Sequence, residues 1–506
     1  MKTPRLSWTT HSPSPPSAMD NNDQANLSEE LDDPSPISNT RSSIMDDQVN
    51  LSEQLLLLNE LGYSGLDSPY HRAAVRNNMR YRDPDTNREM RLLDCIAVAL
   101  STGKPGEVFA ASFDKREQMQ LVLAKNGPPT PDDIEASQEL ISLIGNPDVL
   151  HAMHIFPFLL RRCGDNMNKR IRSLHQAIQD EDLRGVFALK LQTYEPSDDI
   201  AAEFPGVSGG GLLLRKYGDV VPPFLTVWNA FVEEVTNITA EGLNTTDVPL
   251  SRAKYFQIFV HADAIKRSLF LKTLLENHNS LTYDSKLRAE KFKRRLGKIC
   301  QYMVGITDLI EKAKRLFPIP HRWVTEAFAG SGENVFNICE NPHDAVSRGL
   351  DLPALPPAIV DKLDAQFPSV RGNWERQQTM HASIHPELRI ILHLGPPIPY
   401  KLSRACHAIG VSKRTCSCCN LWIESYNYKL LTKWMTSGSN DKLYVDWGLP
   451  GAEALACPYA ANHFGGSSVD DDVLYAVSKR LAKALDLLFA GQMSYNEARE
   501  WERRFR

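Results

Sequence analysis

The chain has 506 residues, of which 42% are hydrophobic and 24% charged, and its formal net charge at pH 7 is −5. Because one compact core rarely holds a chain of this length, the composition predicts a globular protein with two domains and a tail. The negative net charge excludes a general attraction to nucleic acid, so any polynucleotide binding would need a local basic patch.

The cysteines indicate where the protein works. There are nine, an odd number, and four of them lie within residues 406–419. This pattern argues against a disulfide scaffold and favours a reducing compartment, so we expect an intracellular protein, cytoplasmic or nuclear. No apolar run approaches the length that spans a bilayer, and the Ser- and Pro-rich N-terminus lacks the apolar centre of a secretory signal. A membrane partner is therefore not expected.

Residues 1–48 are predicted to be a disordered tail, because Ser, Pro, Asn and Asp dominate and large apolar side chains are few. Residues 23–31 of this tail recur, with small changes, as residues 47–55. Only the second copy continues into apolar residues, Leu56 to Leu58, so only this copy is predicted to form an ordered helix. The repeat is compatible with an internal duplication, a binding motif, or a true start at Met45.

Residues 49–318 are predicted to form an α-helical accessory domain. Apolar residues recur at three- and four-residue spacing in residues 91–100, 132–144, 224–235, 255–275 and 286–316. In the last of these, Phe292, Leu296, Ile299 and Met303 mark the expected buried stripe. The run Gly209 to Gly211 lacks the spacing of a phosphate-binding loop, and no other motif here indicates chemistry.

A basic cluster lies near the end of this region. Between residues 286 and 298 it contains Lys286, Arg288, Lys291, Lys293, Arg294, Arg295 and Lys298, with Glu290 as the acidic residue among them. Such a run is usually the solvated face of a helix. It would also suit a surface that follows the phosphates of a polynucleotide, and the sequence leaves both interpretations open.

Two Pro-rich segments, residues 317–320 and 352–357, introduce a second domain, predicted at residues 321–470. Its most informative feature is His385-Pro386-Glu387, followed 29 positions after the Glu by Cys416, with Cys419 one helical turn further on. Imidazole and thiolates are ligands that zinc prefers, and three protein ligands leave a fourth tetrahedral position open. Glu387 lies too close to His385 to be a comfortable fourth ligand, but it could handle the protons of a bound water.

A closed structural zinc site is the alternative to this open one, because closed sites normally carry four protein ligands. Nearby candidates for the fourth ligand are Cys406, His407, His393 and Cys418. Cys418 is the least suitable, since on a helix it points about 100° away from its neighbour Cys419. It is better explained as a small buried apolar side chain.

The residues around both motifs predict how they are held. Residues 385–394 have the pattern of a buried helix with Pro386 in its first turn, where a missing N–H costs nothing. A short β-like run follows, with Ala408, Ile409 and Val411 at its centre. Thr415 is expected to be the N-cap of a second helix whose first turn holds the two thiols as thiolates. Two helix starts brought together across a strand would converge on one metal ion.

With these motifs, residues from about 350 to 450 resemble the zinc-dependent cytidine and nucleic-acid deaminase superfamily, which shares the His-x-Glu and Cys-x-x-Cys layout. The closest resemblance is to the group expanded in filamentous fungi and related to bacterial toxin deaminases. The resemblance rests on His385-x-Glu387, residues 409–413, Cys416-x-x-Cys419 and residues 443–450. Thr415 departs from the pattern, because many members have Pro directly before the first Cys.

The resemblance implies that His385, Cys416 and Cys419 hold Zn²⁺, which supplies hydroxide for attack on the amine-bearing carbon of cytosine or adenine. Glu387 would be the catalytic residue that moves the protons. Ser412 and Lys413 could contact a phosphate or the base, or could form an ordinary polar strand edge. The implied substrate is a nucleotide or a single-stranded nucleic acid. A non-catalytic, zinc-stabilised interaction module is the second hypothesis.

The predicted fold is therefore α/β: a deaminase-like mixed sheet flanked by helices, preceded by the α-helical accessory domain. Residues 471–506 are expected to form a C-terminal packing helix that lies back on the sheet. Its apolar stripe is Leu474, Val477, Leu481, Ala484, Leu485 and Leu488. The choices between cytosine and adenine, and between DNA, RNA and a free nucleotide, stay open at this point, and no protein partner is implied.

Overall fold

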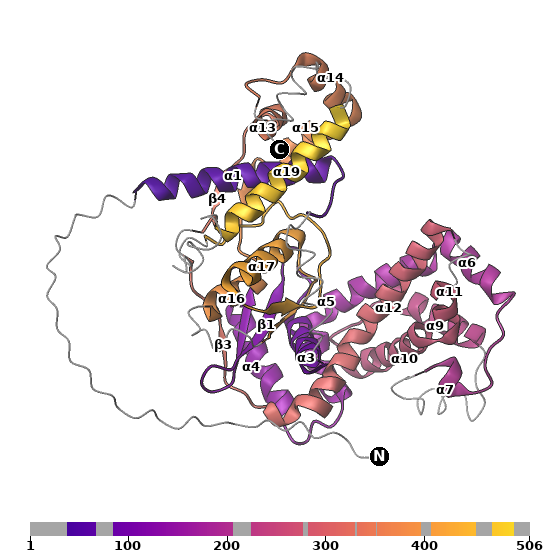
Figure 1. Cartoon of the computed structure of the whole chain (residues 1–506). Coiled ribbons are helices and arrows are strands. Elements are labelled where there is room, and N and C mark those ends of the chain that lie inside the picture. The colour runs from indigo at the N-terminus through magenta and orange to yellow at the C-terminus, as the bar shows by residue number, and fades with distance from the viewer. Residues whose placement is uncertain are drawn as a thin grey trace, which may run out of the picture.

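The structure is a computed structural model that describes residues 38–66, 84–205, 224–276, 282–328, 331–350, 352–395, 406–451 and 468–489. It is a mixed α/β structure, with a central sheet, a group of helices above it and a helical lobe at its side (Figure 1). None of the helices within these ranges combines the length and the apolar character needed to cross a membrane.

The sheet has five strands in the order β3-β2-β1-β6-β7. These are β3 (His321–Trp323), β2 (Gln120–Lys125), β1 (Phe109–Asp114), β6 (His407–Val411) and β7 (Trp434–Thr436). The central strand β1 pairs antiparallel with β2 and β6, whereas the outer pairs β2–β3 and β6–β7 are parallel. The predicted mixed sheet flanked by helices is confirmed.

This sheet crosses the predicted domain boundary. Strands β1 and β2 lie within residues 49–318, which were expected to be helical, yet they pair with β6 and β3 from residues 321–470. The division at residues 318–321 stays a prediction about folding units, and the shared sheet argues against it. The two strands were missed because each is short and buried over most of its length. Such a continuous apolar run cannot be told from a helix segment by its periodicity.

Most of the helices predicted within residues 49–318 are confirmed. The elements of this region are α3 (Pro84–Leu100), α4 (Pro131–Gly145), α5 (Ala152–Ile178), α6 (Glu181–Leu191), α7 (Ile200–Glu203), α9 (Phe224–Glu241), α10 (Val248–Arg267), α11 (Leu269–Glu276) and α12 (Tyr283–Asp308). The predicted helix 255–275 breaks at Ser268, whose hydroxyl accepts from the Leu271 N–H and so caps α11. After α12 the chain continues through a π turn (Leu309–Ala313) and a 3-10 turn (Lys314–Leu316). The run Gly209 to Gly211 lies outside the described residues.

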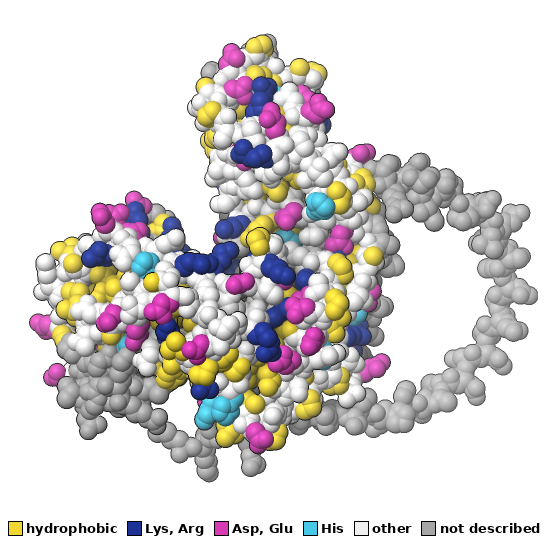
Figure 2. Space-filling model, turned by 180° about the vertical axis from the view of Figure 1, so that it is seen from behind, with side chains coloured by type: hydrophobic (Ala, Val, Ile, Leu, Met, Phe, Trp, Pro, Cys, Tyr) yellow, Lys and Arg dark blue, Asp and Glu magenta, His cyan; other side chains and the backbone are white. Residues whose placement is uncertain are grey.

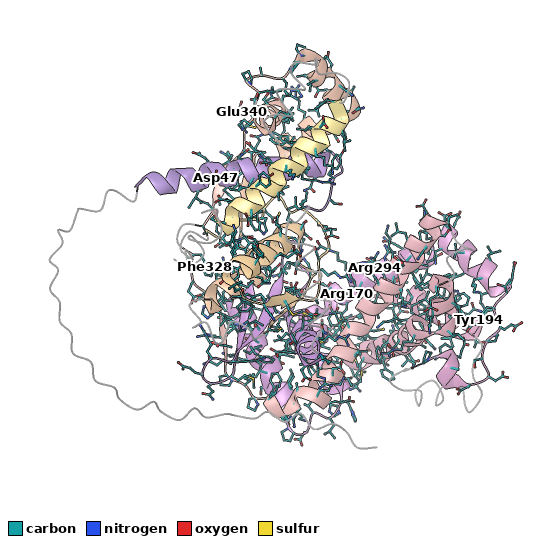
Figure 3. All side chains as sticks on the ribbon, viewed as in Figure 1. Asp47, Arg170, Tyr194, Arg294, Phe328 and Glu340 are labelled. Atoms are coloured by element: carbon teal, nitrogen blue, oxygen red, sulfur yellow. The ribbon has the colours of Figure 1, made fainter. Side chains whose placement is uncertain are left out.

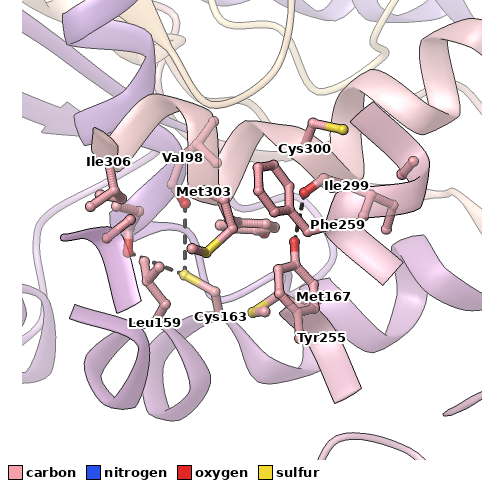
Figure 4. Packing of buried hydrophobic residues seen from close by; sticks show 14 of the residues in the cluster. Val98, Leu159, Cys163, Met167, Tyr255, Phe259, Ile299, Cys300, Met303 and Ile306 are labelled. Atoms are coloured by element: carbon pink, nitrogen blue, oxygen red, sulfur yellow. Dashed lines mark hydrogen bonds between the residues drawn. The ribbon is translucent and has the colours of Figure 1, made fainter. Parts of the chain in front are cut away.

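Helix α12 holds the lobe together through its predicted stripe. Phe292, Leu296, Ile299 and Met303 are all buried, as expected. Ile299 and Met303 pack beside Tyr255 of α10 and against α5 (Figure 4). The Tyr255 hydroxyl donates to the Ile299 carbonyl at 2.6 Å, so the polar tip of this fully buried ring is satisfied.

A second group of helices lies on the face of the sheet opposite α3, with α16 in contact with the strands and most of the others packed on one another. It comprises α1 (Ser38–Glu60), α13 (Pro342–Gly349), α14 (Pro357–Gln366), α15 (Val370–Arg376), α16 (Pro386–Leu394), α17 (Ser417–Leu430) and α19 (Val469–Phe489), with a small hairpin of β4 (Val335–Asn337) and β5 (Thr379–His381). Helix α16 packs on β1 and β2, and α17 packs beneath α19. The predicted C-terminal helix (471–506) is present as α19 as far as Phe489, and residues 490–506 lie outside the described residues. The main contacts of α19 are with α17, α1 and α13 and not with the sheet.

Helix α1 begins at Ser38, inside the predicted tail of residues 1–48. It carries the second copy of the repeated segment. Leu51 and Leu55 to Leu58 are buried in the hydrophobic core that this group of helices forms with the sheet, called here the second core. The expectation of an ordered helix at the second copy is thus confirmed. The first copy, at residues 23–31, lies outside the described residues.

Gly410 in β6 sets how closely α3 can approach the sheet. A Cβ at this position would lie 2.0 Å from the Leu93 carbonyl carbon and 2.1 Å from the Asp94 nitrogen. We expect Gly410→Ala to force α3 away and to lower the free energy of unfolding by roughly 1–3 kcal/mol. Urea unfolding of the full chain would measure the change.

Gly185→Ala in α6 is the matched control, because nothing lies within 4 Å of the added Cβ. Alanine is the better helix former, so this variant should stabilise the chain by up to about 1 kcal/mol. Unchanged stability in Gly410→Ala would contradict the close contact of α3 with β6.

Candidate metal centre

The first side of the centre is the start of α16. His385 is the N-cap of this helix, with extended backbone angles, and Pro386 follows as its first residue. A Pro is tolerated there because the first N–H groups of a helix have no intrahelical partner. The predicted buried helix is confirmed, and Gly395 is its C-cap.

The second side is the start of α17. Cys416 itself is the N-cap, and its Sγ accepts from the Cys419 N–H at 3.3 Å. The predicted N-cap, Thr415, is therefore wrong by one residue: its N–H donates instead to the Gly438 carbonyl. The reason is that the thiol sulfur takes the acceptor role that a hydroxyl would otherwise fill.

The two helix starts bring one ring nitrogen and two sulfurs together. Nδ1 of His385 lies 3.5 Å from Sγ of Cys416 and 3.3 Å from Sγ of Cys419, and all three side chains are buried. Zinc–nitrogen and zinc–sulfur bonds at a tetrahedral angle would separate such atoms by about 3.6 Å. This group could therefore hold a metal ion, and its donor atoms suit zinc.

Of the candidates for a fourth ligand, His393 and His407 contact other residues, and Cys418 lies in the core. His393 Nδ1 lies 2.8 Å from the Glu326 carboxylate, and the His407 ring stacks on Trp434 with centroids 4.6 Å apart. Cys418 is fully buried in the second core, as expected for an apolar side chain. Within the described part of the chain, the group suited to a metal consists of His385, Cys416 and Cys419, so a closed set of four protein ligands is not formed there.

The pKa values of His385, Cys416 and Cys419 depend on one another. Burial opposes a charge on His385, but the negative Cys416 beside it outweighs this and raises its pKa to about 9. The pKa of Cys416 lies well below its ordinary value despite burial, because Cys418, Cys419 and His385 stabilise the thiolate. Burial and this neighbouring charge raise the pKa of Cys419. Binding of a metal ion must therefore displace protons from His385 and Cys419.

Glu387 lies against this group. Only 2% of its surface is exposed, and it interacts with the Cys419 side chain and with the charge of His385. Burial raises the pKa of its carboxyl, and the attraction to His385 only partly offsets this. The carboxyl of Glu387 therefore holds its proton more firmly than an exposed glutamate does.

Residues 443–450, which the sequence singled out only as part of the resemblance, support the centre. The Tyr444 ring meets the His385 ring edge-on, with centroids 5.7 Å apart. Tyr444 and Asp446 also line a surface pocket of about 390 Å³, together with Met380 and His381 of β5. Tyr444 and Asp446 could have been suspected from the sequence as an aromatic and an acidic residue near the centre, but only the fold brings β5 beside them.

Trp447 fixes one of the sulfurs. Its indole Nε1–H donates to Sγ of Cys419 at 3.1 Å, and the side chain is fully buried. Its own backbone is held by Gln48 of α1, whose side-chain amide donates to the Trp447 carbonyl and accepts from the Leu449 N–H. A residue near the start of the chain thus supports a ligand more than 360 residues later.

Ser412 and Lys413 were predicted with two possible roles. Ser412 continues the pairing of β6 with β1: its N–H donates to the Phe109 carbonyl and its hydroxyl accepts from the Phe109 N–H, both at 2.9 Å. This favours the strand-edge interpretation for Ser412. Lys413 is exposed, with Lys169 of α5 nearby. A contact of either residue with substrate stays a prediction.

Comparisons with known proteins agree with this geometry. Residues 384–451 match the family model described as an OTT_1508_deam-like deaminase. The matched range contains His385, Glu387, Cys416, Cys419 and Trp447. Searches of curated proteins and of solved structures returned no match.

Two thiols in one helical turn allow a direct test of the ligand set. Cys416→Ser should remove bound zinc, measured by mass spectrometry of the purified chain, because one of three donors is lost. Cys418→Ala should keep about one zinc per chain, since this thiol interacts with the Cys416 sulfur but lies outside the group of ligands. Equal zinc loss in both variants would contradict the assignment.

Trp447→Phe tests the support of Cys419. Phenylalanine keeps an aromatic ring but lacks the indole N–H, so zinc affinity should fall by roughly 10- to 100-fold in a chelator competition. Trp422→Phe is the control: this Trp is equally buried, but its N–H donates to Asp470 at 2.8 Å and not to a ligand. If both variants bind zinc as the unmodified chain does, Trp447 does not tune the centre.

Proposed function

We propose, from the membership of residues 384–451 in the deaminase superfamily and its toxin-related branch, that this protein hydrolyses the amine from a nucleobase. The base is cytosine or adenine, carried in a nucleotide or a nucleic acid. The observation that carries the proposal is the buried group of His385, Cys416 and Cys419, with the Glu387 carboxyl against it.

In this proposal His385, Cys416 and Cys419 hold a zinc ion. When bound, zinc lowers the pKa of a coordinated water towards neutrality and so supplies the nucleophile for hydrolysis. The residues of this chain do the rest: they fix the ligands, exclude water and move protons. Trp447 and the cap interaction of Cys416 keep the two sulfurs in place.

Glu387 is the proposed proton carrier. Its carboxylate would take a proton from the attacking water, protonate the ring nitrogen next to the amine-bearing carbon, and then pass a proton to the departing amine. The balance is one water consumed and one ammonia released, with the amine replaced by a carbonyl oxygen. Burial of Glu387 supports this role, because it raises the pKa of the carboxyl and so favours the protonated form that a proton donor needs.

The pocket beside Tyr444 is the proposed place of the base. It opens between Tyr444 and Asp446 on one side and Met380 on the other. An aromatic ring and an apolar side chain offer faces for a planar base, while a carboxylate can accept a hydrogen bond from an N–H on its edge.

Glu387→Gln is the decisive variant. It should keep about one zinc per chain and the same unfolding midpoint, while ammonia release falls by roughly 10²- to 10⁴-fold. Ammonia would be measured across nucleosides, nucleotides and single-stranded oligonucleotides. Glu424→Gln on α17 is the matched control, because this carboxylate accepts from the Asn420 side chain and lies away from the ligands along the helix.

The same screen tests the second hypothesis, a zinc-stabilised interaction module. That hypothesis predicts a full complement of zinc but neither turnover nor tight binding of a hydrated-pyrimidine or hydrated-purine mimic. Turnover of any base that Glu387→Gln abolishes would exclude it. Zinc bound at an intact centre, with no substrate converted and no mimic bound, would refute the deaminase proposal.

A further inference from the structure

Basic side chains from separate parts of the chain gather near the metal centre. The group, called here the basic surface, consists of Arg170 of α5, Arg295 and Lys298 of α12, and Arg414 and Lys442 from the two loops beside α17. Arg170 donates to the Lys298 carbonyl at 2.8 Å. The Asn440 side chain connects the two loops, since it donates to the Arg414 carbonyl and accepts from the Lys442 N–H.

The two halves of the basic surface lie close enough to affect each other. The pKa of Lys298 is lowered, first because neighbouring groups partly remove it from water and then because of the positive charges of Arg170, Arg414, Lys442 and Arg295. Figure 2 shows Lys and Arg side chains gathered at the notch where the helical lobe meets the rest of the molecule, and Arg170 is labelled at this junction in Figure 3. The helical lobe and the deaminase domain therefore contribute to one positive region.

These charges are not neutralised within the part of the chain that the structure describes. No ion pair there joins Arg170, Arg295, Lys298, Arg414 or Lys442 to a carboxylate. Arg288, earlier on α12, differs, because it pairs with Asp180 and Asp182, both at 2.8 Å. The predicted basic cluster of α12 thus divides into a neutralised end and an open end. Like charges held together repel, so the open end favours the approach of an anion.

The basic surface reaches the start of α17, because the Lys442 carbonyl accepts from the Ser417 N–H at 2.9 Å. Arg414 is two residues before the cap residue Cys416, and Lys442 is two residues before Tyr444 at the pocket. An anion bound along the surface would therefore lie next to the place proposed for the base. A chain whose net charge is −5 offers little long-range attraction of its own, so this local region would have to supply it.

We propose that the basic surface binds the phosphate backbone of a single-stranded polynucleotide and leads one of its bases to the metal centre. This rests on the proposed function and names its substrate class. A single strand is favoured over a duplex because a base must leave its stack to reach a buried centre. It is favoured over an acidic protein or an anionic membrane because Lys442 directly precedes Leu443 and Tyr444, which line a pocket, and an aromatic ring there suits a base attached to a phosphate chain.

The test measures binding and not turnover. The Glu387→Gln chain loaded with zinc is titrated into fluorescent 20-nucleotide single strands, DNA and RNA, at several salt concentrations. Arg295→Gln with Lys298→Gln should weaken binding roughly tenfold at low salt and lower the salt slope by about 1.4, since each phosphate contact contributes about 0.7. Arg252→Gln with Lys272→Gln is the matched control, with the same loss of one Arg and one Lys on exposed positions of the same lobe.

Each outcome decides the matter. Weakening confined to the Arg295/Lys298 pair supports the proposal; equal weakening by both pairs, or no binding by the unmodified surface, overturns it. Binding to anionic lipid vesicles or to polyglutamate as tight as to the oligonucleotide also overturns it. Deamination of a free nucleoside without oligonucleotide binding would support the proposed function and overturn the polynucleotide proposal. Oligonucleotide binding without ammonia release from any substrate would support the polynucleotide surface and overturn the proposed function.

Discussion

The structure depends on placing four polar groups in a dry interior at a fixed separation. His385, Glu387, Cys416 and Cys419 are all buried, and buried polar groups are costly unless each has a partner. The chain meets this condition by making His385 and Cys416 the cap residues of two helices, so that backbone geometry determines where the ring and the sulfur lie. The rest of the fold keeps those two helix starts at one distance: α16 is seated on β1 and β2, while the loop after β6 leads directly into α17.

The parts of this centre that the sequence could predict are local. The spacing of His385, Glu387, Cys416 and Cys419, the Pro at the helix start and the apolar run after each motif all lie within a few residues of the features that they determine. Thr415 shows the limit even at short range. Its residue type is a good cap, but the strand-like bridge to Ser439 occupies its backbone, and the neighbouring sulfur becomes the cap.

The parts that escaped prediction depend on contacts between distant residues. Strands β1 and β2 read as apolar runs without periodicity, and only their pairing with β6 and β3 identifies them as the middle of the sheet. Trp447 lies in the segment 443–450 that carries the resemblance, but neither Trp447 nor Gln48 was assigned a role at the metal, because each acts through a partner that is remote in sequence. The basic surface also depends on distant residues. The run of basic residues on α12 was recognised in the sequence, but its division into a neutralised and an open end follows from Asp180, Asp182 and two loops of another part of the chain.

The five-stranded sheet also determines which parts of the chain the metal centre needs in order to fold. The residues that would carry the chemistry occupy a short stretch, 384–451, yet the strand beside β6, the helix behind Gly410 and the amide that grips Trp447 all come from before residue 126. In an excised fragment of that stretch, the edge of β6 would be unpaired and the face of β6 that packs on α3 would be exposed. Such a fragment would collapse or aggregate instead of folding. In evolutionary terms, such a segment could move between proteins only together with the N-terminal quarter of the chain. Because α5 and α12 of the long insertion between β2 and β3 pack on α3, which backs β6, part of that insertion would have to accompany it.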